Sequence, residues 1–413
     1  MTKNDFLNKI YLKKRFGKRA GLEVMRDYSE ALGFPEHGMR VIHIAGTNGK
    51  GSTAASLSSI LRSCGFNVGL FTSPHLVNFN ERIKYNGEDI SDEDLLTVGK
   101  RIMEVETFKE STMFDDALAM ALLYFRDKKC DYVILETGLG GRLDSTTGLD
   151  VVPRVSIITK IGLDHVKILG HSISDIAKEK AGILKHGTTL VLAENMPEAR
   201  NEIVRIADEM GVSVIYAADY DVSEINYSLR GKYQRENMEN AVAAVNLLSE
   251  VDVEFWKDRK IFLKKAIENG LMSARWPGRM QVVSNAPFIL VDGAHNPQGV
   301  EALYESLRLT YPDDKFIGVC GVLADKDYTH MFGMMQSCLE KCYTVTIDSE
   351  RALCGEDLQK VFEEIGIPAQ AAGDTKSALS IVIDEAKRDK KKVVCFGSLY
   401  FVGEILKFLE TKI

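Results

Sequence analysis

A glycine-rich loop at residues 45–54, AGTNGKGSTA, constrains the fold more than any other feature of this sequence. It follows the apolar run RVIHIAG and precedes the helical run STAASLSSILRSCG. A strand, a glycine loop and a helix in this order predict a βα unit whose backbone N–H groups and helix N-terminus bind phosphate. A plain glycine-rich turn would not need the strand, the helix and Lys50 together.

The residue after the lysine departs from the general phosphate-loop pattern. That pattern places Ser or Thr there, where the hydroxyl holds Mg²⁺. Here Gly51 has that position, and Ser52 and Thr53 follow it. The loop predicts a nucleotide site in which Lys50 reaches the outer phosphates, but by itself it does not predict the reaction.

Strand-like and helical runs alternate along the rest of the chain. Buried-type strands such as DYVILETG and VSIIT alternate with helical patterns, as in a doubly wound, mostly parallel α/β sheet. The pattern breaks at SARWPGRMQ and restarts at PFILVDGAHNPQG. We predict a phosphate-loop domain over residues 1–274, a linker at 275–279 and a smaller Rossmann-like α/β domain over 280–413. Helices are expected over about Asn4–Leu32, Tyr227–Val245 and Phe255–Leu271.

Length and composition exclude several classes of function. A chain of 413 residues allows about two to three domains. The net charge of −7 argues against non-specific binding of nucleic acid or anionic membranes. The seven cysteines show no CxxC spacing, and Cys338 and Cys342, one helical turn apart, would make at most half a metal site. Without a signal peptide or a long apolar run, we expect a cytoplasmic protein, and by default a monomer.

Polar residues follow several of the predicted strands. Open α/β sheets place their sites at the carboxyl ends of strands, and Mg²⁺ prefers oxygen ligands. Alone, each such residue has an ordinary interpretation, for example a surface histidine or an Asx turn. Together, three polar strand ends beside one phosphate loop predict a site. They are Thr72, Ser73 and His75; Glu136, Arg142 and Asp144; and Asp164 with His165.

Eight motifs in this chain together resemble the folylpolyglutamate synthase/dihydrofolate synthase family of Mur-type ligases. They are GTNGKGST, TSPHLVNFNERI, ETGLGGRLDST, GLDHVKILG, IAKEKAGILK, WPGR, DGAHNP and GSLYFVGE, and they cover nearly the whole chain. The resemblance implies an ATP-dependent ligase whose substrates are L-glutamate, ATP and a folate or dihydropteroate. ATP would phosphorylate the folate carboxylate, and glutamate would displace phosphate from the acyl phosphate.

The resemblance also implies roles for particular residues. Lys50, Glu136, His165 and Lys180 would be catalytic, and Ser73, Glu136 and His165 would hold Mg²⁺. Lys180 would carry CO₂ as N6-carboxylysine, whereas the residues alone suggest a solvated helix face for both Lys178 and Lys180. ATP would contact Thr47, Asn48, Gly49, Lys50, Gly51, Ser52 and Asn237, and Arg279, Asp292 and His295 of the C-terminal domain. The pteridine substrate would contact Thr112, Phe114, Asp115, Leu143, Asp144 and Ser145.

Four positions depart from the family pattern. Asp115 stands where a glutamate is usual, and Leu118 replaces a common threonine. Thr147 stands where an asparagine commonly follows, and Lys167 where an acidic residue is frequent. None of them replaces a residue that is expected to bind metal or phosphate. They therefore bear on how the pterin end is bound and on which folate is preferred.

Several functions remain open at this stage. The segments TSPHL and PEHGMR favour a bifunctional enzyme over one that only polyglutamylates. A ligase for UDP-muramoyl peptides would need an additional N-terminal domain, for which the roughly 45 residues before the loop leave little room. A nucleotide-dependent switch or binding protein would have no use for DGAHNP in its second domain.

Overall fold

The computed structural model describes residues 2–13, 21–324 and 327–410 and divides into two compact units. The first comprises Met1–His75, Phe79–Ser228 and Arg235–Arg275. The second comprises Trp276–Ile413 together with two short earlier segments, Leu76–Asn78 and Leu229–Gln234. The sequence predicted two domains that are each continuous along the chain, whereas the second unit also includes these two earlier segments.

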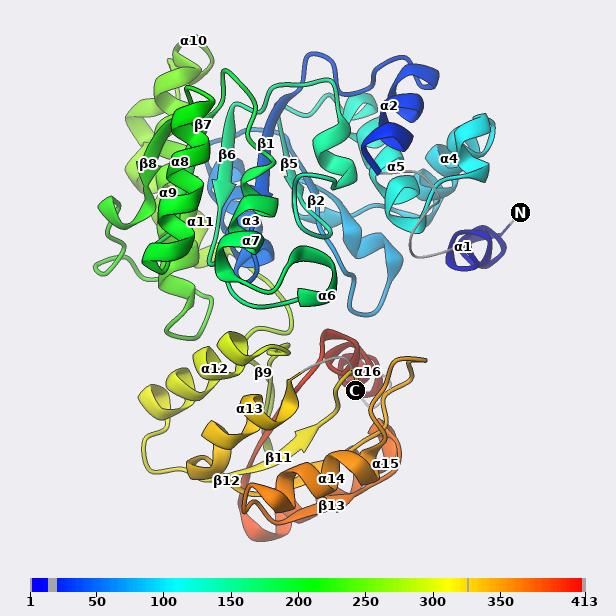
Figure 1. Cartoon of the computed structure of the whole chain (residues 1–413), viewed down its shortest axis with the longest axis vertical. Coiled ribbons are helices and arrows are strands. Elements are labelled where there is room, and N and C mark those ends of the chain that lie inside the picture. The colour runs from blue at the N-terminus through cyan, green and yellow to red at the C-terminus, as the bar shows by residue number, and fades with distance from the viewer. Residues whose placement is uncertain (1, 14–20, 325–326, 411–413) are drawn as a thin grey trace. The chain divides into compact units, whose positions relative to one another are not determined.

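An eight-stranded sheet forms the first unit (Figure 1). The strand order is β4-β3-β2-β5-β1-β6-β7-β8, and only β3 and β4 run antiparallel to their neighbours. Strands β2, β5 and β6 are buried along their whole length, which explains why their sequences are mostly apolar. The strands are β1 (Arg40–Ala45), β2 (Val68–Phe71), β3 (Ile83–Tyr85), β4 (Glu88–Asp89), β5 (Tyr132–Glu136), β6 (Val155–Ile158), β7 (Thr189–Leu192) and β8 (Ser213–Tyr216).

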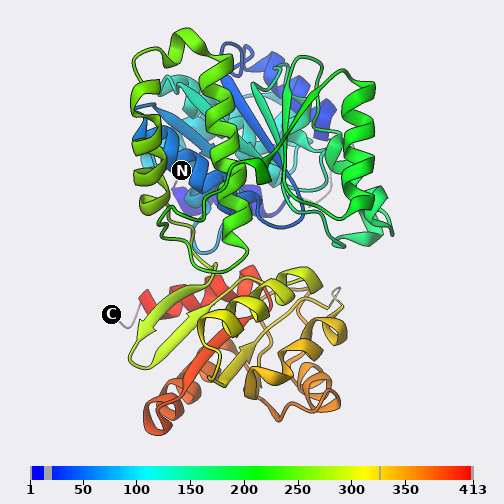
Figure 2. The ribbon, with the colours of Figure 1, turned by 90° about the vertical axis from the view of Figure 1, so that its left-hand side faces the viewer.

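Helices cover both faces of this sheet (Figure 2). One core joins α1, α2, α4 and α5 to the β2–β5–β1 region, and another joins α7 and α8 to β6 and β7. Helix α3 packs against β1, β2 and β5 and against α11. The helices are α1 (Lys3–Tyr11), α2 (Gly21–Ala31), α3 (Lys50–Ser63), α4 (Asp92–Met103), α5 (Met113–Asp127), α6 (Val166–Leu169), α7 (Ile173–Ala181), α8 (Pro197–Glu209), α9 (Gln234–Val251), α10 (Val253–Trp256) and α11 (Leu263–Ser273).

Three of the expected helices have different bounds. The N-terminal one is two helices, α1 and α2, and part of the segment between them lies outside the described residues. Helix α9 begins at Gln234 and not at Tyr227, because Gly231 within the expected span adopts φ 108°, which an α-helix cannot accommodate. The third is interrupted after Trp256, whose indole Nε1 turns inward and donates to Tyr132 Oη at 2.8 Å.

The second unit is a six-stranded sheet of order β13-β12-β11-β14-β10-β9, parallel except for β9. The strands are β9 (Gln281–Asn285), β10 (Phe288–Val291), β11 (Phe316–Cys320), β12 (Leu339–Thr344), β13 (Ala369–Ala371) and β14 (Lys392–Phe396). The helices are α12 (Pro297–Thr310), α13 (Tyr328–Gly333), α14 (Gly355–Glu364), α15 (Thr375–Asp389) and α16 (Leu399–Glu410). They enclose two apolar cores that lie on opposite faces of the sheet.

The cysteines are free thiols. Cys338 and Cys342 do not share a helical turn, as their spacing suggested, because Cys342 belongs to β12. Both are buried, and burial raises the pKa of each thiol, so they act as core residues.

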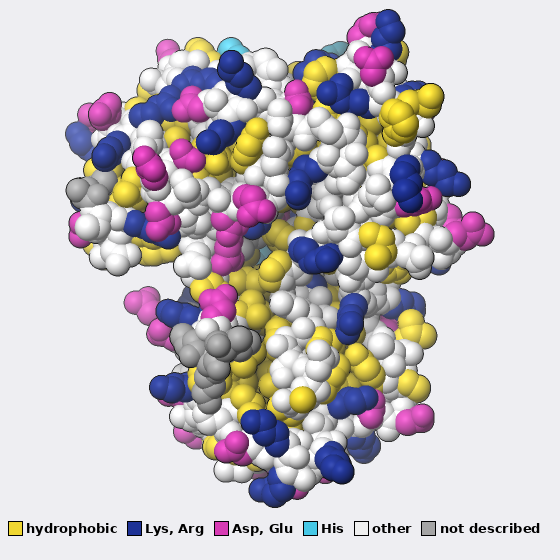
Figure 3. Space-filling view, turned by 180° about the vertical axis from the view of Figure 1, so that it is seen from behind, with side chains coloured by type: hydrophobic (Ala, Val, Ile, Leu, Met, Phe, Trp, Pro, Cys, Tyr) yellow, Lys and Arg dark blue, Asp and Glu magenta, His cyan; other side chains and the backbone are white. Residues whose placement is uncertain are grey.

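On the face drawn in Figure 3, Lys and Arg side chains are interspersed with Asp and Glu and form no single basic field. Among the described residues, no helix combines the length and apolarity needed to cross a bilayer.

Candidate active site

Four neighbouring strands of the first unit, β2, β5, β1 and β6, end at the same edge of the sheet. The register pairs Ile44 with Glu136 and Ala45 with Ile158, so the loops that follow these strands start side by side. Ser73, the phosphate loop and His165 lie in these loops, and Glu136 is the last residue of β5. The sheet order thus gathers onto one edge four motifs that are far apart in the sequence.

The phosphate loop is held in shape by the loop after β6. The backbone N–H groups of Thr47 and Asn48 both donate to the Lys160 carbonyl, at 2.8 and 3.2 Å. The Thr47 hydroxyl donates to the Gly162 carbonyl at 3.0 Å. Two of the residues predicted to contact phosphate therefore have their amides occupied, and the anion-binding capacity lies at the start of α3. There, helix geometry leaves the N–H groups of Lys50, Gly51 and Ser52 without an intrahelical acceptor.

Two glycines of the loop allow close approaches that a side chain would block. A Cβ on Gly46 would lie 1.8 Å from Thr159 Oγ1. A Cβ on Gly49 would lie 2.1 Å from Asn237 Oδ1, and Gly49 also adopts φ 94° as the N-cap of α3. The predicted ATP residue Asn237, from α9, therefore lies directly against the phosphate loop.

Two lysines converge on the same carbonyl of the phosphate loop. Lys180 Nζ donates to the Gly46 carbonyl oxygen at 2.7 Å, and Lys50 Nζ donates to it at 3.1 Å. Lys180 is only 4% exposed, whereas Lys178 on the same helix is exposed. The solvated-face interpretation is thus wrong for Lys180 and correct for Lys178. Burial, with a further contribution from the Lys50 charge, lowers the pKa of Lys180 to about 7.

Glu136 is the last residue of β5 and is 4% exposed. Its carboxylate accepts a hydrogen bond from the Ser73 backbone N–H at 3.2 Å and lies 3.9 Å from Lys50 Nζ. Glu136 is therefore a buried strand-end carboxylate and not a solvated loop residue. The carboxylate borders the cationic end of the phosphate loop and the loop after β2.

His165 lies in the loop after β6 and caps α6 in a left-handed conformation, with φ 51°. Its Nε2 is 4.0 Å from Asp164 Oδ1. Within the described ranges, no three His, Cys, Asp or Glu side chains group as a metal site. The predicted metal set differs from such a group, because its third donor is a serine.

Asp144 organises the glycine loop after β5. Its Oδ2 accepts hydrogen bonds from the N–H groups of Gly138 and Leu139 at 2.9 and 2.8 Å. Its Oδ1 accepts from the Thr146 N–H and hydroxyl at 3.0 and 2.6 Å. The Asx-turn interpretation of Asp144 is correct, because this carboxylate closes the loop on itself.

A buried histidine that belongs to none of the predicted site motifs supports that loop. His43 in β1 is 2% exposed, and its Nε2 lies 2.7 Å from Thr146 Oγ1. The Thr146 hydroxyl donates its only hydrogen to Asp144, so His43 Nε2 must be the donor to Thr146. Burial lowers the pKa of His43 to about 3, which keeps the ring neutral. The available signal was a single polar residue inside the apolar run RVIHIAG.

The residues expected to contact the pteridine end lie at the start of α5 and in the glycine loop after β5. Thr112 is its N-cap, and Asp115 Oδ2 accepts from both the N–H and the hydroxyl of Thr112 at 2.8 Å. Asp115 Oδ1 accepts from the Ser145 hydroxyl at 2.5 Å. Phe114 lies so near the glycine loop that a Cβ on Gly138 would be 2.6 Å from its ring, and Leu143 in that loop is 49% exposed.

Arg279, Asp292 and His295 belong to the second unit. Asp292 follows β10 and is buried, and it accepts from Tyr233 Oη at 2.7 Å and from the N–H groups of Met280 and Ala294 at 2.8 Å. His295 Nδ1 lies 2.7 Å from the Gly293 carbonyl, which makes Nδ1 the protonated nitrogen. Within its own unit, Asp292 therefore holds together the turn that presents His295.

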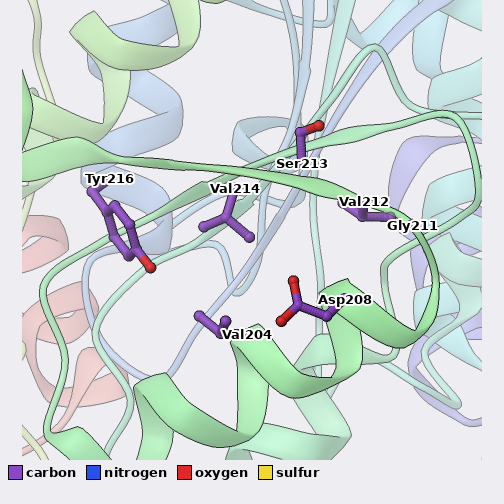
Figure 4. A pocket seen from close by; sticks show the side chains of 7 residues that line it. All are labelled: Val204, Asp208, Gly211, Val212, Ser213, Val214 and Tyr216. Atoms are coloured by element: carbon purple, nitrogen blue, oxygen red, sulfur yellow. The ribbon is translucent and has the colours of Figure 1, made fainter.

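A shallow hollow of about 440 Å³ lies elsewhere, between α8 and the edge strand β8 (Figure 4). Val204 and Asp208 of the helix line it together with Val214 and Tyr216. It is separated from β1 by β6 and β7. Among the described residues that line it, Asp208 is the single carboxylate and there is no Lys or Arg, so the hollow makes neither a phosphate site nor a metal site.

Comparisons with known proteins agree with the geometry. The family model "Mur ligase middle domain" matches residues 44–216, and "Mur ligase, glutamate ligase domain" matches residues 278–399. A relative from Bacillus subtilis, "Dihydrofolate synthase/folylpolyglutamate synthase", is 34% identical over 97% of both chains. "E.coli FolC in complex with DHPP and ADP" superposes with a TM-score of 0.86 at 27% identity, covering 100% of this chain and 98% of that one. A bifunctional synthase from Yersinia pestis with AMPPNP and a Mn ion gives 0.86 at 27% identity, covering 99% and 98%.

Proposed function

Because this chain belongs to the dihydrofolate synthase/folylpolyglutamate synthase family, it is an ATP-dependent ligase that joins glutamate to folate, and we propose that it accepts both dihydropteroate and tetrahydrofolate. The observation that supports the ligase chemistry is the meeting of Lys50, Glu136 and Lys180 around the phosphate loop. The bifunctional part is supported by the names of the Bacillus and Yersinia proteins.

The reaction must first make a carboxylate electrophilic. We propose that a folate carboxylate oxygen attacks the γ-phosphorus of ATP, the bond to the β-phosphate oxygen breaks and ADP leaves. The amino nitrogen of L-glutamate then attacks the acyl carbon, the bond to the phosphate oxygen breaks, and the nitrogen loses a proton as the amide forms. Since phosphorylation supplies the leaving group, the protein has to position the reactants and neutralise oxygen charge.

The residues at the sheet edge suit that task. The Lys50 ammonium and the first N–H groups of α3 would bind the negative oxygens of the transferred phosphoryl group. The bonds from Thr47 and Asn48 to Lys160 fix the loop, so little would have to rearrange when ATP binds. Asp115, Thr112 and Ser145 would hold the pteridine end.

A divalent cation fits beside this loop. Glu136 supplies a buried carboxylate next to Ser73, and an oxygen-rich set completed by His165 suits Mg²⁺ or Mn²⁺. We propose that Ser73, Glu136 and His165 hold it. When bound, such a cation would neutralise charge on the phosphate oxygens.

We also propose that Lys180 carries CO₂. An amine attacks CO₂ only when it is neutral, and a pKa of about 7 leaves a large neutral fraction near neutral pH. The neutral nitrogen forms a bond to the carbon of CO₂, one C–O π bond breaks, and the nitrogen releases a proton to solvent, so that a neutral amine becomes an anionic carbamate. An anion at this buried position would also favour a nearby divalent metal. Nuclear magnetic resonance with carbon-13-labelled bicarbonate tests this: a carbamate signal is expected in the wild type and absent after Lys180→Ala. An equal signal in both would overturn the assignment.

ADP release in the presence of L-glutamate, Mg²⁺ and ATP tests the activity. It is expected with dihydropteroate and, in a separate reaction, with tetrahydrofolate. Release with tetrahydrofolate alone would overturn the bifunctional proposal and leave polyglutamylation. Release that depends on neither acid would overturn the ligase itself, and turnover with a UDP-muramoyl acceptor would indicate a different Mur ligase.

A further inference from the structure

A buried ion pair lies directly behind the segment expected to contact the pteridine end of the substrate. We propose that Lys13 and Asp116, with Tyr28 and Ser111, are positioning residues that fix Thr112–Asp115 and so set the affinity for the folate substrate. The inference rests on the proposed function, because it concerns the binding of the same substrate. None of the four residues is expected to touch the substrate itself.

Lys13 is fully satisfied by the loop that opens α5. Its Nζ donates to the Phe108 carbonyl at 2.5 Å, to Ser111 Oγ at 2.8 Å and to Asp116 Oδ2 at 2.5 Å. The ammonium also lies 3.4 Å from the centroid of the Phe108 ring. The Lys13 side chain is 12% exposed and that of Asp116 is 0% exposed. Three donors with three acceptors leave this ammonium one geometry in which all its bonds are made.

Asp116 receives two further hydrogen bonds on its other oxygen. Oδ1 accepts from Tyr28 Oη at 2.6 Å and from Ser111 Oγ at 2.6 Å. Tyr28 belongs to α2 and is 0% exposed. One carboxylate thus joins three separate parts of the chain: Lys13 after the C-cap of α1, helix α2 and the first turn of α5.

Asp115, the residue before Asp116, belongs to the segment that is expected to contact the substrate. Asp115 bonds to Thr112 on one oxygen and to Ser145 on the other. Successive residues of an α-helix point about 100° apart, so Asp115 and Asp116 anchor the same turn from two sides. A second contact reinforces this link, because a Cβ on Gly21, the first residue of α2, would lie 2.5 Å from Ser145 Oγ. A displacement of Asp116 would therefore move the pair Asp115–Ser145.

The test is the Michaelis constant of each substrate. In the double variant Lys13→Met/Asp116→Asn both charges are removed, so no buried charge is left unpaired. We expect KM for the folate acid to rise about tenfold, while kcat and the KM values for ATP and glutamate stay within about twofold of the wild type. Lys13→Arg alone keeps a cation beside the carboxylate and is expected to retain most of the folate affinity.

Two further variants are a conservative substitution that is expected to fold and a control at the other end of α5. Tyr28→Phe removes one hydroxyl and keeps the ion pair, so it is expected to fold and to raise the folate KM by about threefold. Asp127→Asn, at the far end of α5, breaks the exposed pair with Arg101 and is the matched control, for which no change in folate KM is expected.

The outcomes distinguish the two proposals. If the wild type shows no ADP release dependent on glutamate and a folate acid, the proposed function fails. If the wild type is active and the folate KM is unchanged in both the double variant and Tyr28→Phe, the positioning role alone is overturned. A parallel rise of all three KM values with a fall in kcat would also overturn it, since that pattern indicates general structural damage.

Discussion

Acid should destabilise the first unit through one buried histidine. In the folded chain the pKa of His43 is lowered from 6.5 to about 3 by burial, whereas the unfolded chain has the ordinary value. Between these two values the unfolded state binds a proton that the folded state excludes. Stability is therefore fully present above pH 6.5 and falls as the pH is lowered through that window. One pH unit below the unfolded pKa, the loss amounts to about 1.4 kcal/mol.

Urea unfolding followed by the fluorescence of Trp256 measures this loss. Trp256 is fully buried in the first unit, and Trp276→Phe removes the chain's other tryptophan. The comparison variant is His43→Gln, whose amide nitrogen can still donate to Thr146 but does not titrate. Between about pH 7.5 and pH 5.5, the wild type should lose about 1.4 kcal/mol more of its unfolding free energy than His43→Gln.

His75 does not disturb this comparison. Its pKa is also lowered to about 3, by burial and by Arg82, but it is present in both proteins and its contribution cancels. Equal pH dependence of the wild type and His43→Gln would refute the reasoning, because it would mean that His43 is protonated in the folded state without cost.

Three further predictions concern the phosphate loop, the buried lysine and the base of the sheet. Gly49→Ala should raise KM for ATP at least about tenfold, because the added methyl group would clash with Asn237. Gly65→Ala is the control, since Gly65 has a similar φ of 82° but open space around it, and its KM for ATP should not change. Equal ATP kinetics in the two variants would contradict this prediction. Lys180→Ala should abolish ADP release and added bicarbonate should not restore it, while Lys178→Ala should stay active; near-wild-type turnover of Lys180→Ala would overturn its role. Tyr132→Phe removes the hydroxyl that links Asp252 and Trp256 and should lower the unfolding free energy by about 1–3 kcal/mol. Tyr85→Phe, which removes an exposed hydrogen bond, should lower it by about 0.5 kcal/mol. Similar urea midpoints for the two variants would argue against a buried hydrogen-bond network.

The sequence predicted the architecture because the relevant signals are local. Apolar runs bounded by glycine loops marked the parallel strands, and the phosphate loop placed β1 at the centre of the site. The polar strand ends at Ser73, Glu136 and His165 were recognisable for the same reason. Both the two-sheet α/β fold and the ligase family are confirmed. The residue assignments within the site stay predictions.

Other features depend on tertiary contacts that no local pattern contains. The burial of Lys180 follows from the packing of α7 beneath Gly46, whereas its sequence, IAKEKAGIL, is typical of an exposed helix face. Helix α10 ends at Trp256, whose indole bonds to Tyr132, more than a hundred residues earlier. The role of His43 required knowledge of which loop lies above β1.

The composition of the second unit has a consequence for how the protein can be made and divided. Leu76 packs into one of its apolar cores, and a Cβ on Gly403 would lie 2.0 Å from the Leu76 carbonyl oxygen. Tyr233 packs into the other core and bonds to Asp292. During synthesis on the ribosome, Leu76 and Tyr233 emerge well before the later elements of this unit against which they pack. A gene fragment that starts at Trp276 would lack both side chains, and its product would expose apolar surface that the intact polypeptide covers.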